Sequence, residues 1–196
     1  MSVEKTLEDA NRLFLKKRFL DAISMYDKVL EMNPRNIVAL NNKGYSLGKL
    51  KDHENAILCY DNILQIAPDD KTALTNKISS LRKMKRYEDA ISHCNEILST
   101  HPNDAITLYH KERILFSLGR YSDAVSCCDR ILDTRPENGE VLFDKASSLA
   151  MLNDIDDALD ALSRAVCFSQ QFRTKAKGHR AFATLYDNAR FLKLVS

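Results

Sequence analysis

The sequence is poor in the residues that build flexible or phosphate-binding loops. Only 5 of its 196 residues are glycine and only 4 are proline, and no stretch is rich in glycine, proline and serine together. We therefore expect no flexible linker between folded parts. The patterns GxxxxGK[ST] and GxGxxG, whose backbones cradle phosphate groups, are both missing from the sequence. Their absence argues against nucleotide-dependent chemistry.

Metal and thiol chemistry also lack their usual patterns. The sequence contains neither CxxC nor HExxH, and its five cysteines are an odd number without a disulfide framework. We interpret the cysteines as small buried residues in a reducing cytosol. No pair of carboxylates stands out as an acid and base couple. The expectation from these absences is a protein that is not an enzyme, with no cofactor and no metal site.

Long hydrophobic runs are missing as well. No segment approaches the roughly 18 apolar residues that a membrane-spanning helix needs. Residues 1–20 are charged and amphipathic and lack the apolar centre of a signal peptide. We expect a cytoplasmic protein with no membrane partner.

The four prolines that are present stand 34 residues apart. They are Pro34, Pro68, Pro102 and Pro136. Because proline ends helices, this spacing indicates punctuation between copies of one unit. An alanine follows the same period at Ala22, Ala56, Ala90, Ala124 and Ala158. Internal repetition of this kind decides the architecture.

Aligning the copies gives five repeats. They span residues 3–36, 37–70, 71–104, 105–138 and 139–172. In the second repeat, the spacing of Leu40, Leu47 and Leu50 predicts a first helix near 38–50. A second helix is predicted near 54–66 and ends before Pro68. Neither helix can bury its apolar stripe alone, so each pair must stack on another pair. We interpret the periodic alanine as the residue that lets two helices approach closely.

The repeated stretches resemble the tetratricopeptide repeat family. They are LNNKGYSLGKLKDHENAILCYDNILQIAP, LTNKISSLRKMKRYEDAISHCNEILSTHP and LYHKERILFSLGRYSDAVSCCDRILDTRP. The period, the leucines, the small residue and the closing proline fit its helix–turn–helix pattern over residues 3–172. The resemblance implies an all-α fold, a right-handed α-solenoid of antiparallel helix pairs forming one continuous body. It also implies a function in binding a protein or peptide partner, most often an extended peptide on the concave face.

The last segment, 173–196, does not continue the repeat. We expect it to form one capping helix over 173–195, with an apolar stripe of Phe182, Leu185, Tyr186 and Leu192 that covers the end of the stack. Residues 171–196 also hold six Lys or Arg residues and one acid. They are interpreted mainly as a solvated outer face, and alternatively as a strip that contacts nucleic acid through Lys175, Lys177 and Arg180.

The resemblance places the first helix of each pair on the concave face. The residues expected to face inward are Asn11, Asn41, Asn42, Tyr45, Lys49, Thr75, Asn76, Lys83, Tyr109, Arg113, Phe116, Phe143 and Met151. Amides and lysines dominate the first half and suit the backbone of an extended peptide. Tyr109, Phe116, Phe143 and Met151 would form an apolar patch for a hydrophobic anchor, or would simply pack between repeats.

Some members of this family grip the C-terminal carboxylate of a heat-shock chaperone with lysine, arginine and asparagine. Asn11 and Asn42 fit that pattern, but Leu7, Thr72 and Asn76 stand where the cations belong. Since a carboxylate needs those cations, we do not expect binding of a chaperone tail.

The leading hypothesis is therefore a non-catalytic adaptor or scaffold that holds a partner segment in its groove. A self-associating structural protein is the alternative, together with the nucleic-acid contact of the basic segment.

One further periodic feature concerns the first helices, where lysine recurs at Lys43, Lys77, Lys111 and Lys145. We interpret these lysines as buried stems whose ammonium groups reach solvent.

Overall fold

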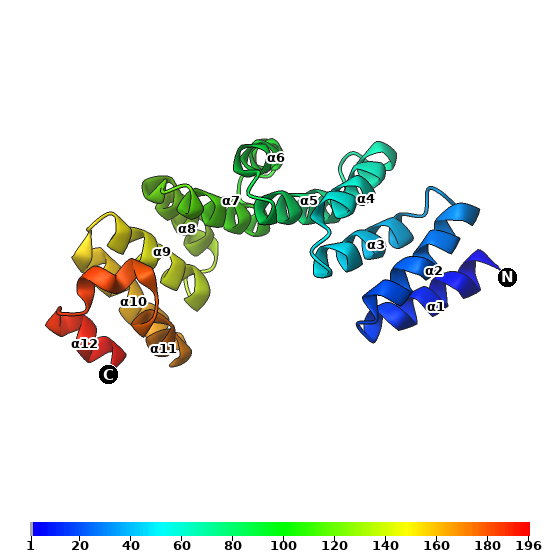
Figure 1. Ribbon diagram of the computed structural model, residues 1–196. Helices are drawn as coiled ribbons and strands as arrows, with labels where there is room; N and C mark the ends of the chain where they lie inside the picture. Colours follow the sequence, from blue (N-terminus) through cyan, green and yellow to red (C-terminus); the bar gives the residue numbers. More distant parts are fainter. Residues whose placement is uncertain (1) are drawn as a thin grey trace. The chain divides into compact units, whose positions relative to one another are not determined.

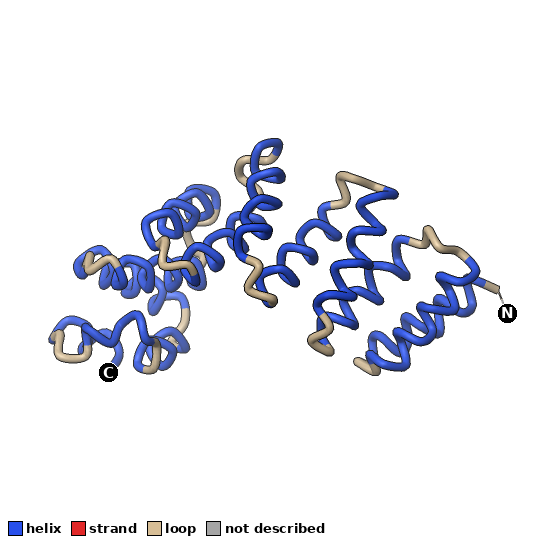
Figure 2. The backbone as a smooth tube through the Cα atoms, turned by 45° about the horizontal axis from the view of Figure 1, so that its top comes forward, coloured by secondary structure: helices blue, strands red, loops and turns tan. Residues whose placement is uncertain are grey.

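A computed structural model describes residues 2–196 of the chain. Within this range the chain forms helices joined by turns and no strand, as Figures 1 and 2 show. The repeats contain α1 (Val3–Leu15), α2 (Phe19–Met32), α3 (Ile37–Lys49), α4 (His53–Ile66), α5 (Lys71–Lys83), α6 (Tyr87–Thr100), α7 (Ala105–Ser117), α8 (Tyr121–Thr134), α9 (Gly139–Met151) and α10 (Ile155–Phe168). The expected all-α solenoid of helix pairs is confirmed, and the two helices expected in the second repeat are α3 and α4.

The chain divides into two compact units, and the division falls after His93, within α6. In the first unit, each helix from α1 to α4 packs against the next one along the chain. In the second unit, α7 packs on α8, α8 on α9 and α9 on α10. That all five repeats form one continuous body stays a prediction.

The turn between repeats explains the periodic proline. After Pro34, the Asn36 side chain accepts a hydrogen bond from the Ala39 N–H at 2.9 Å and caps the start of α3. The Asn36 N–H also bonds to the Asn33 carbonyl at 3.2 Å, which closes a turn around the proline. Asp70, Asp104 and Asn138 cap α5, α7 and α9 in the same way. Each proline is thus followed, two residues later, by the cap of the next helix.

The turn inside each repeat uses a left-handed residue. The residues with positive φ are Lys17, Lys51, Lys85, Gly119 and Asn153. In the second repeat, the N–H of Asp52 bonds to the Leu47 carbonyl at 3.0 Å across this residue, which is the usual way to end a helix at a left-handed position. Only the fourth repeat has glycine there, so three repeats hold a lysine in a conformation that glycine adopts more easily.

The core lies between paired helices, where the periodic alanines are fully buried. In the second repeat the two helices approach closely at Gly44, because a Cβ atom added there would lie 2.8 Å from Cε1 of Tyr60. Tyr60 is itself buried on α4. In the fourth repeat Glu112 and Cys128 occupy the equivalent places, and both are buried. The second repeat pairs a small residue on its first helix with a large one on its second helix, and the fourth repeat has the reverse. Either combination can fill the space between the two helices.

The recurring lysines of the first helices reach back to the preceding second helix. The ammonium group of Lys43 lies 2.6 Å from Asp27, that of Lys77 lies 2.8 Å from Asp61, and that of Lys145 lies 2.6 Å from Asp129. Lys111 instead donates to the amide oxygen of Asn95 at 2.8 Å. The stems are partly buried, as expected, but the sequence analysis missed the periodic Asp or Asn that receives the ammonium group.

The C-terminal segment differs from the single helix that was expected. It forms α11 (Gln171–Lys177), the 3₁₀ helix η1 (Arg180–Leu185) and α12 (Ala189–Val195). Gly178 ends α11, and the Asn188 side chain caps α12. These breaks change which residues face the core. Phe182 and Leu185 are buried as expected, but Phe191 and Val195 are buried in place of Tyr186 and Leu192.

The three short helices pack on the last repeat. Phe172, Phe182 and Phe191 belong to one buried cluster with residues of α9 and α10. The segment thereby buries the apolar side that the fifth repeat leaves open, which is what a terminal cap of a solenoid does.

Candidate partner-binding surface

The amides expected on the concave face are held by one another. Asn42 donates to the side-chain oxygen of Asn11 at 3.1 Å, and the Tyr26 hydroxyl donates to the same oxygen at 2.8 Å. Asn76 donates to the side-chain oxygen of Asn41 at 3.1 Å. An amide group carries two donor hydrogens and an oxygen with two lone pairs. These contacts fix the orientation of the amides and leave capacity for further hydrogen bonds.

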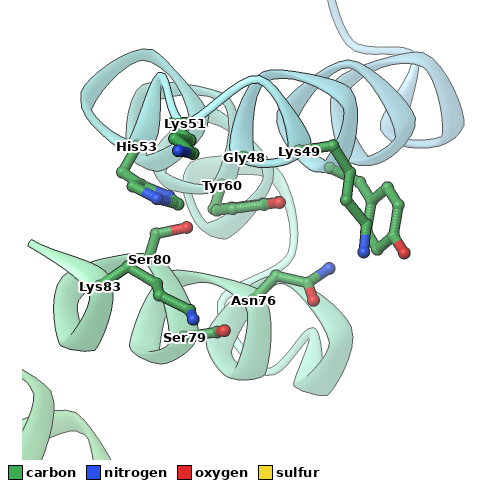
Figure 3. A pocket seen from close by; sticks show the side chains of 10 residues that line it. Gly48, Lys49, Lys51, His53, Tyr60, Asn76, Ser79, Ser80 and Lys83 are labelled. Atoms are coloured by element: carbon green, nitrogen blue, oxygen red, sulfur yellow. The ribbon is translucent and has the colours of Figure 1, made fainter. Parts of the chain in front are cut away.

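Four of the expected residues gather in one pocket of the first unit. We call it the α3–α5 pocket, and its volume is about 590 Å³. It is lined by Tyr45, Gly48, Lys49, Lys51, His53, Tyr60, Asn76, Ser79, Ser80 and Lys83, as Figure 3 shows. Tyr45, Lys49, Asn76 and Lys83 were expected on this face, whereas the sequence analysis missed the other six. A volume of this size is within the range of about 300–1,000 Å³ that is typical of ligand sites.

Local sequence explains how the pocket forms. Gly48 leaves an open space on α3, since an added Cβ atom would meet nothing closer than His53 Nδ1 at 3.9 Å. The left-handed turn at Lys51, with a φ angle of 69°, sets this lysine and His53 beside the gap. Tyr60 forms an inner wall, and burial raises the pKa of its hydroxyl, which therefore stays a neutral hydrogen-bond donor.

Tyr45 stands at the edge of the pocket with its ring already in contact with two side chains. The Lys49 ammonium group lies 4.9 Å from the centre of the ring, and the Phe14 ring meets it edge-on at 5.5 Å. These contacts hold both residues of α3 in place. Thr75 lies outside the pocket lining, and its hydroxyl donates to the Lys71 carbonyl at 2.6 Å.

In the second unit, Arg113 contacts Tyr109, another of the expected surface residues, and also Asp144, which was not expected there. Its guanidinium group donates to the Tyr109 hydroxyl at 2.9 Å and lies 3.4 Å from the Asp144 carboxylate. Burial lowers the pKa of Arg113, but Asp144, Tyr109 and Glu112 together raise it above its ordinary value. Arg113 therefore stays charged, and both it and Tyr109 remain partly exposed.

The expectation that Phe143 offers an accessible apolar surface is wrong, because its side chain is fully buried. Its ring stacks on Phe172 at 5.6 Å and meets Phe182 edge-on at 5.7 Å. The Lys175 ammonium group lies 4.2 Å from the centre of the same ring. The expected patch is therefore divided, since the C-terminal segment occupies the space in front of Phe143.

The same segment also reaches α7. The His179 ring lies 6.3 Å from that of Phe116 and 5.5 Å from that of Phe143, and Arg180 lies 5.8 Å from the centre of the Phe116 ring. Phe116 stays partly exposed, and Met151, at the end of α9, is 37% exposed. Packing within the chain thus takes much of the apolar surface expected in this half.

Two basic residues of the C-terminal segment, Lys175 and Arg190, have acidic partners inside the chain. Lys175 lies 2.9 Å from Glu140, and Arg190 bonds to Asp156 at 3.1 Å and to Asp160. These pairs reduce the positive charge that the segment presents to solvent. They give Lys175 a role in docking the segment onto α9, and Arg190 a role in docking it onto α10.

The described part of the chain was also compared with the requirements of metal, thiol and membrane sites. Across residues 2–196, no three His, Cys, Asp or Glu side chains are placed to hold a metal ion. Burial raises the pKa of the Cys94 thiol to about 12 and also raises that of Cys59, Cys127 and Cys128. Over the same residues, every helix falls short of the length and apolar character that crossing a bilayer demands.

Stacked helix pairs of this kind define a helical-repeat protein. Sequence profiles of the tetratricopeptide repeat match residues 37–70 and 113–174. The chain therefore contains tetratricopeptide repeats. Members of this family serve as scaffolds for protein–protein interaction and are typically not catalytic. No protein among the curated sequences matches the chain.

Solved structures share the fold at low sequence identity. MamA (residues 41 to the end) from Desulfovibrio magneticus RS-1 has a TM-score of 0.79 at 16% identity, covering 86% of this chain and 96% of its own. A tetratricopeptide repeat protein from Parabacteroides merdae has a TM-score of 0.84 at 18% identity, covering 98% of this chain and 77% of its own. YrrB, described as a tetratricopeptide repeat protein with an unusual peptide-binding site, has a TM-score of 0.71 at 17% identity, covering 91% and 93%.

Proposed function

We propose that this protein is a non-catalytic adaptor that holds an extended segment of a partner protein against its first helices. The observation that carries the proposal is the α3–α5 pocket. Residues expected to face a ligand from α3 and α5, Tyr45, Lys49, Asn76 and Lys83, line the same hollow. A pocket between consecutive repeats can receive a side chain while the peptide backbone crosses the helices.

The amides beside the pocket support the same proposal. Asn41 and Asn76 bond to each other across α3 and α5 and keep unused donor and acceptor capacity. An extended peptide offers backbone N–H and C=O groups that such amides can satisfy. YrrB, which has a similar fold, carries a peptide-binding site according to its description. The family and these features favour an adaptor over a structural protein that only self-associates.

Site-specific photocrosslinking in cells of the native host tests the proposal. A benzoylphenylalanine replaces Tyr45, which is 39% exposed at the pocket, or Leu58, which is 59% exposed on α4 and outside the pocket lining. The adaptor model predicts a crosslinked partner protein from position 45 and a much weaker product from position 58. Mass spectrometry then locates the crosslinked segment of the partner.

The opposite pattern would overturn the proposal. Crosslinks that form at position 58 and not at position 45 would place the working surface elsewhere. A product at position 45 that consists of a second copy of this chain would favour the self-associating alternative.

A further inference from the structure

The α3–α5 pocket is lined by cations and neutral donors and by no acid. Lys49, Lys51 and Lys83 supply three ammonium groups, and none of the ten lining residues is Asp or Glu. Clefts lined by one sign of charge focus the field and attract ligands of opposite sign. The pocket therefore gathers three positive charges, which an anionic ligand would complement.

Other lysines of the first unit have acidic partners, so the absence of acids around the pocket lysines is not a general property of the unit. Lys43 and Lys77 each hold an aspartate at ion-pair distance, so their charges are cancelled inside the chain. The carboxylate nearest in sequence to Lys51 is Asp52, and its two oxygens accept from the backbone and side-chain N–H groups of Asn55 at 3.3 and 2.8 Å. Asp52 is thus engaged in capping α4 and does not line the pocket.

The lining is rich in donors that complement the lysines. The hydroxyls of Ser79, Ser80 and Tyr60 and the amide of Asn76 line the same hollow as the lysines (Figure 3). A carboxylate accepts hydrogen bonds and donates none, so it can use ammonium, hydroxyl and amide donors together. Lys49 and Lys83 come from equivalent places of consecutive repeats, 34 residues apart. Two acidic side chains of one extended peptide could each meet one of them.

We propose that the α3–α5 pocket recognises acidic side chains, so that the partner segment is an extended peptide rich in glutamate or aspartate. This inference rests on the proposed adaptor function and names the chemistry of its ligand. Nucleic acid fits the lining less well. Tyr45, the aromatic residue at the pocket edge, already has an ammonium group over its ring, whereas single-stranded nucleic acid is usually bound through bases stacked on open aromatic faces.

Fluorescence anisotropy on the full chain tests the proposal with labelled decapeptides. One probe alternates glutamate with serine, and the second has glutamine in place of every glutamate. The glutamate peptide should bind at least about tenfold more tightly, because hydrogen bonds to charged groups are the stronger ones. Its affinity should fall as the salt concentration rises.

Charge reversal identifies the site. The variant Lys49→Glu/Lys83→Glu should weaken binding of the glutamate peptide by about tenfold or more. It should also gain affinity for a third probe with lysine in place of glutamate. The matched control is Lys5→Glu/Lys28→Glu, which makes the same charge change on α1 and α2, at exposed residues outside the pocket lining. The control should keep the affinity within about twofold, since its charges lie away from the pocket.

Three results would overturn the inference. Equal binding of the glutamate and glutamine peptides would remove the acidic specificity, while crosslinking at position 45 could still support the adaptor function. Equal loss in the pocket variant and the control would show an effect of net charge alone. Tighter binding of a labelled single-stranded oligonucleotide, abolished by the pocket variant and not by the control, would assign the pocket to nucleic acid.

Discussion

The close contact between α3 and α4 at Gly44 leads to a quantitative prediction. Gly44 faces Tyr60, and a Cβ atom at position 44 would lie 2.8 and 2.9 Å from two ring carbons and 3.1 Å from Cys59 Cβ. Tyr60 is 2% exposed and cannot move into solvent. We therefore expect Gly44→Ala to overpack this contact at a cost of about 1–3 kcal/mol. The gain in helix propensity from glycine to alanine offsets up to about 1 kcal/mol of that cost.

Gly48 provides a control on the same helix. An added Cβ atom there would meet its nearest neighbour, His53 Nδ1, only at 3.9 Å. Gly48→Ala should therefore keep the gain in propensity without the steric cost. The two variants differ by the overpacking alone, so their free energies of unfolding should differ by about 1–3 kcal/mol. Urea denaturation followed by far-UV circular dichroism measures this difference from the two midpoints.

A second substitution separates overpacking from other effects. The fifth repeat has Ala146 and Leu162 at the places of Gly44 and Tyr60, and both are fully buried. In a Tyr60→Leu background, Gly44→Ala should therefore cost much less or become stabilising, which a double-mutant cycle measures. The reasoning fails if Gly44→Ala is as stable as Gly48→Ala, or if Tyr60→Leu leaves its effect unchanged.

Three further predictions follow from the turns, the C-terminal segment and the cysteines. Lys85 has a φ angle of 61°, so Lys85→Gly should raise the unfolding free energy by up to about 1 kcal/mol, whereas Gly119→Lys, at a φ of 75°, should lower it. Burial, with a smaller contribution from the charges of Lys175 and Arg180, lowers the pKa of His179. Because the unfolded chain therefore binds the proton more readily, the free energy of unfolding should fall as the pH drops below about 6.5. The variant His179→Gln should show a weaker dependence of stability on pH, and an unchanged dependence would contradict the prediction. Iodoacetamide should modify only the exposed Cys167 in the folded protein, and labelling of a second thiol before unfolding would show that the buried cysteines are accessible.

Much of the fold could be predicted from the sequence. Because one local pattern recurs along the chain, it predicts both the helices and the packing of each helix pair on the next. From Pro68 and the spacing of the leucines, the ends of both helices in the second repeat were predicted to within one residue of the bounds of α3 and α4. A helix pair with a closing turn can bury its stripe only against another pair, so stacking follows from period and pattern. The ion pair of Lys77 with Asp61 also follows the period. The lysine period alone does not indicate this pair, because the aspartate lies on the preceding second helix.

The C-terminal segment could not be predicted in the same way. It lacks the repeat, so its apolar residues indicated that it covers the last repeat but not where its helices end and turn. Gly178 and Asn188 break it into short helices, and this change of direction brings Phe191 to the core and covers Phe143. Burial of Phe143 is therefore a tertiary effect. Its position in the repeat indicated the face on which it lies, but not that another part of the chain occupies that face.

The α3–α5 pocket was predicted in part for a related reason. The first helices supplied Lys49 and Lys83, but Lys51 comes from the turn between α3 and α4 and His53 is the first residue of α4, and the resemblance assigned neither to the binding face. Position within the repeat also separates two kinds of lysine. Lys77 is largely buried and paired, so reversing its charge would disturb packing between helices, whereas Lys83 is exposed beside a pocket without acids. Because charge at the second kind of position can change with little effect on the stack, ligand specificity can vary between members of such a family while the fold is kept.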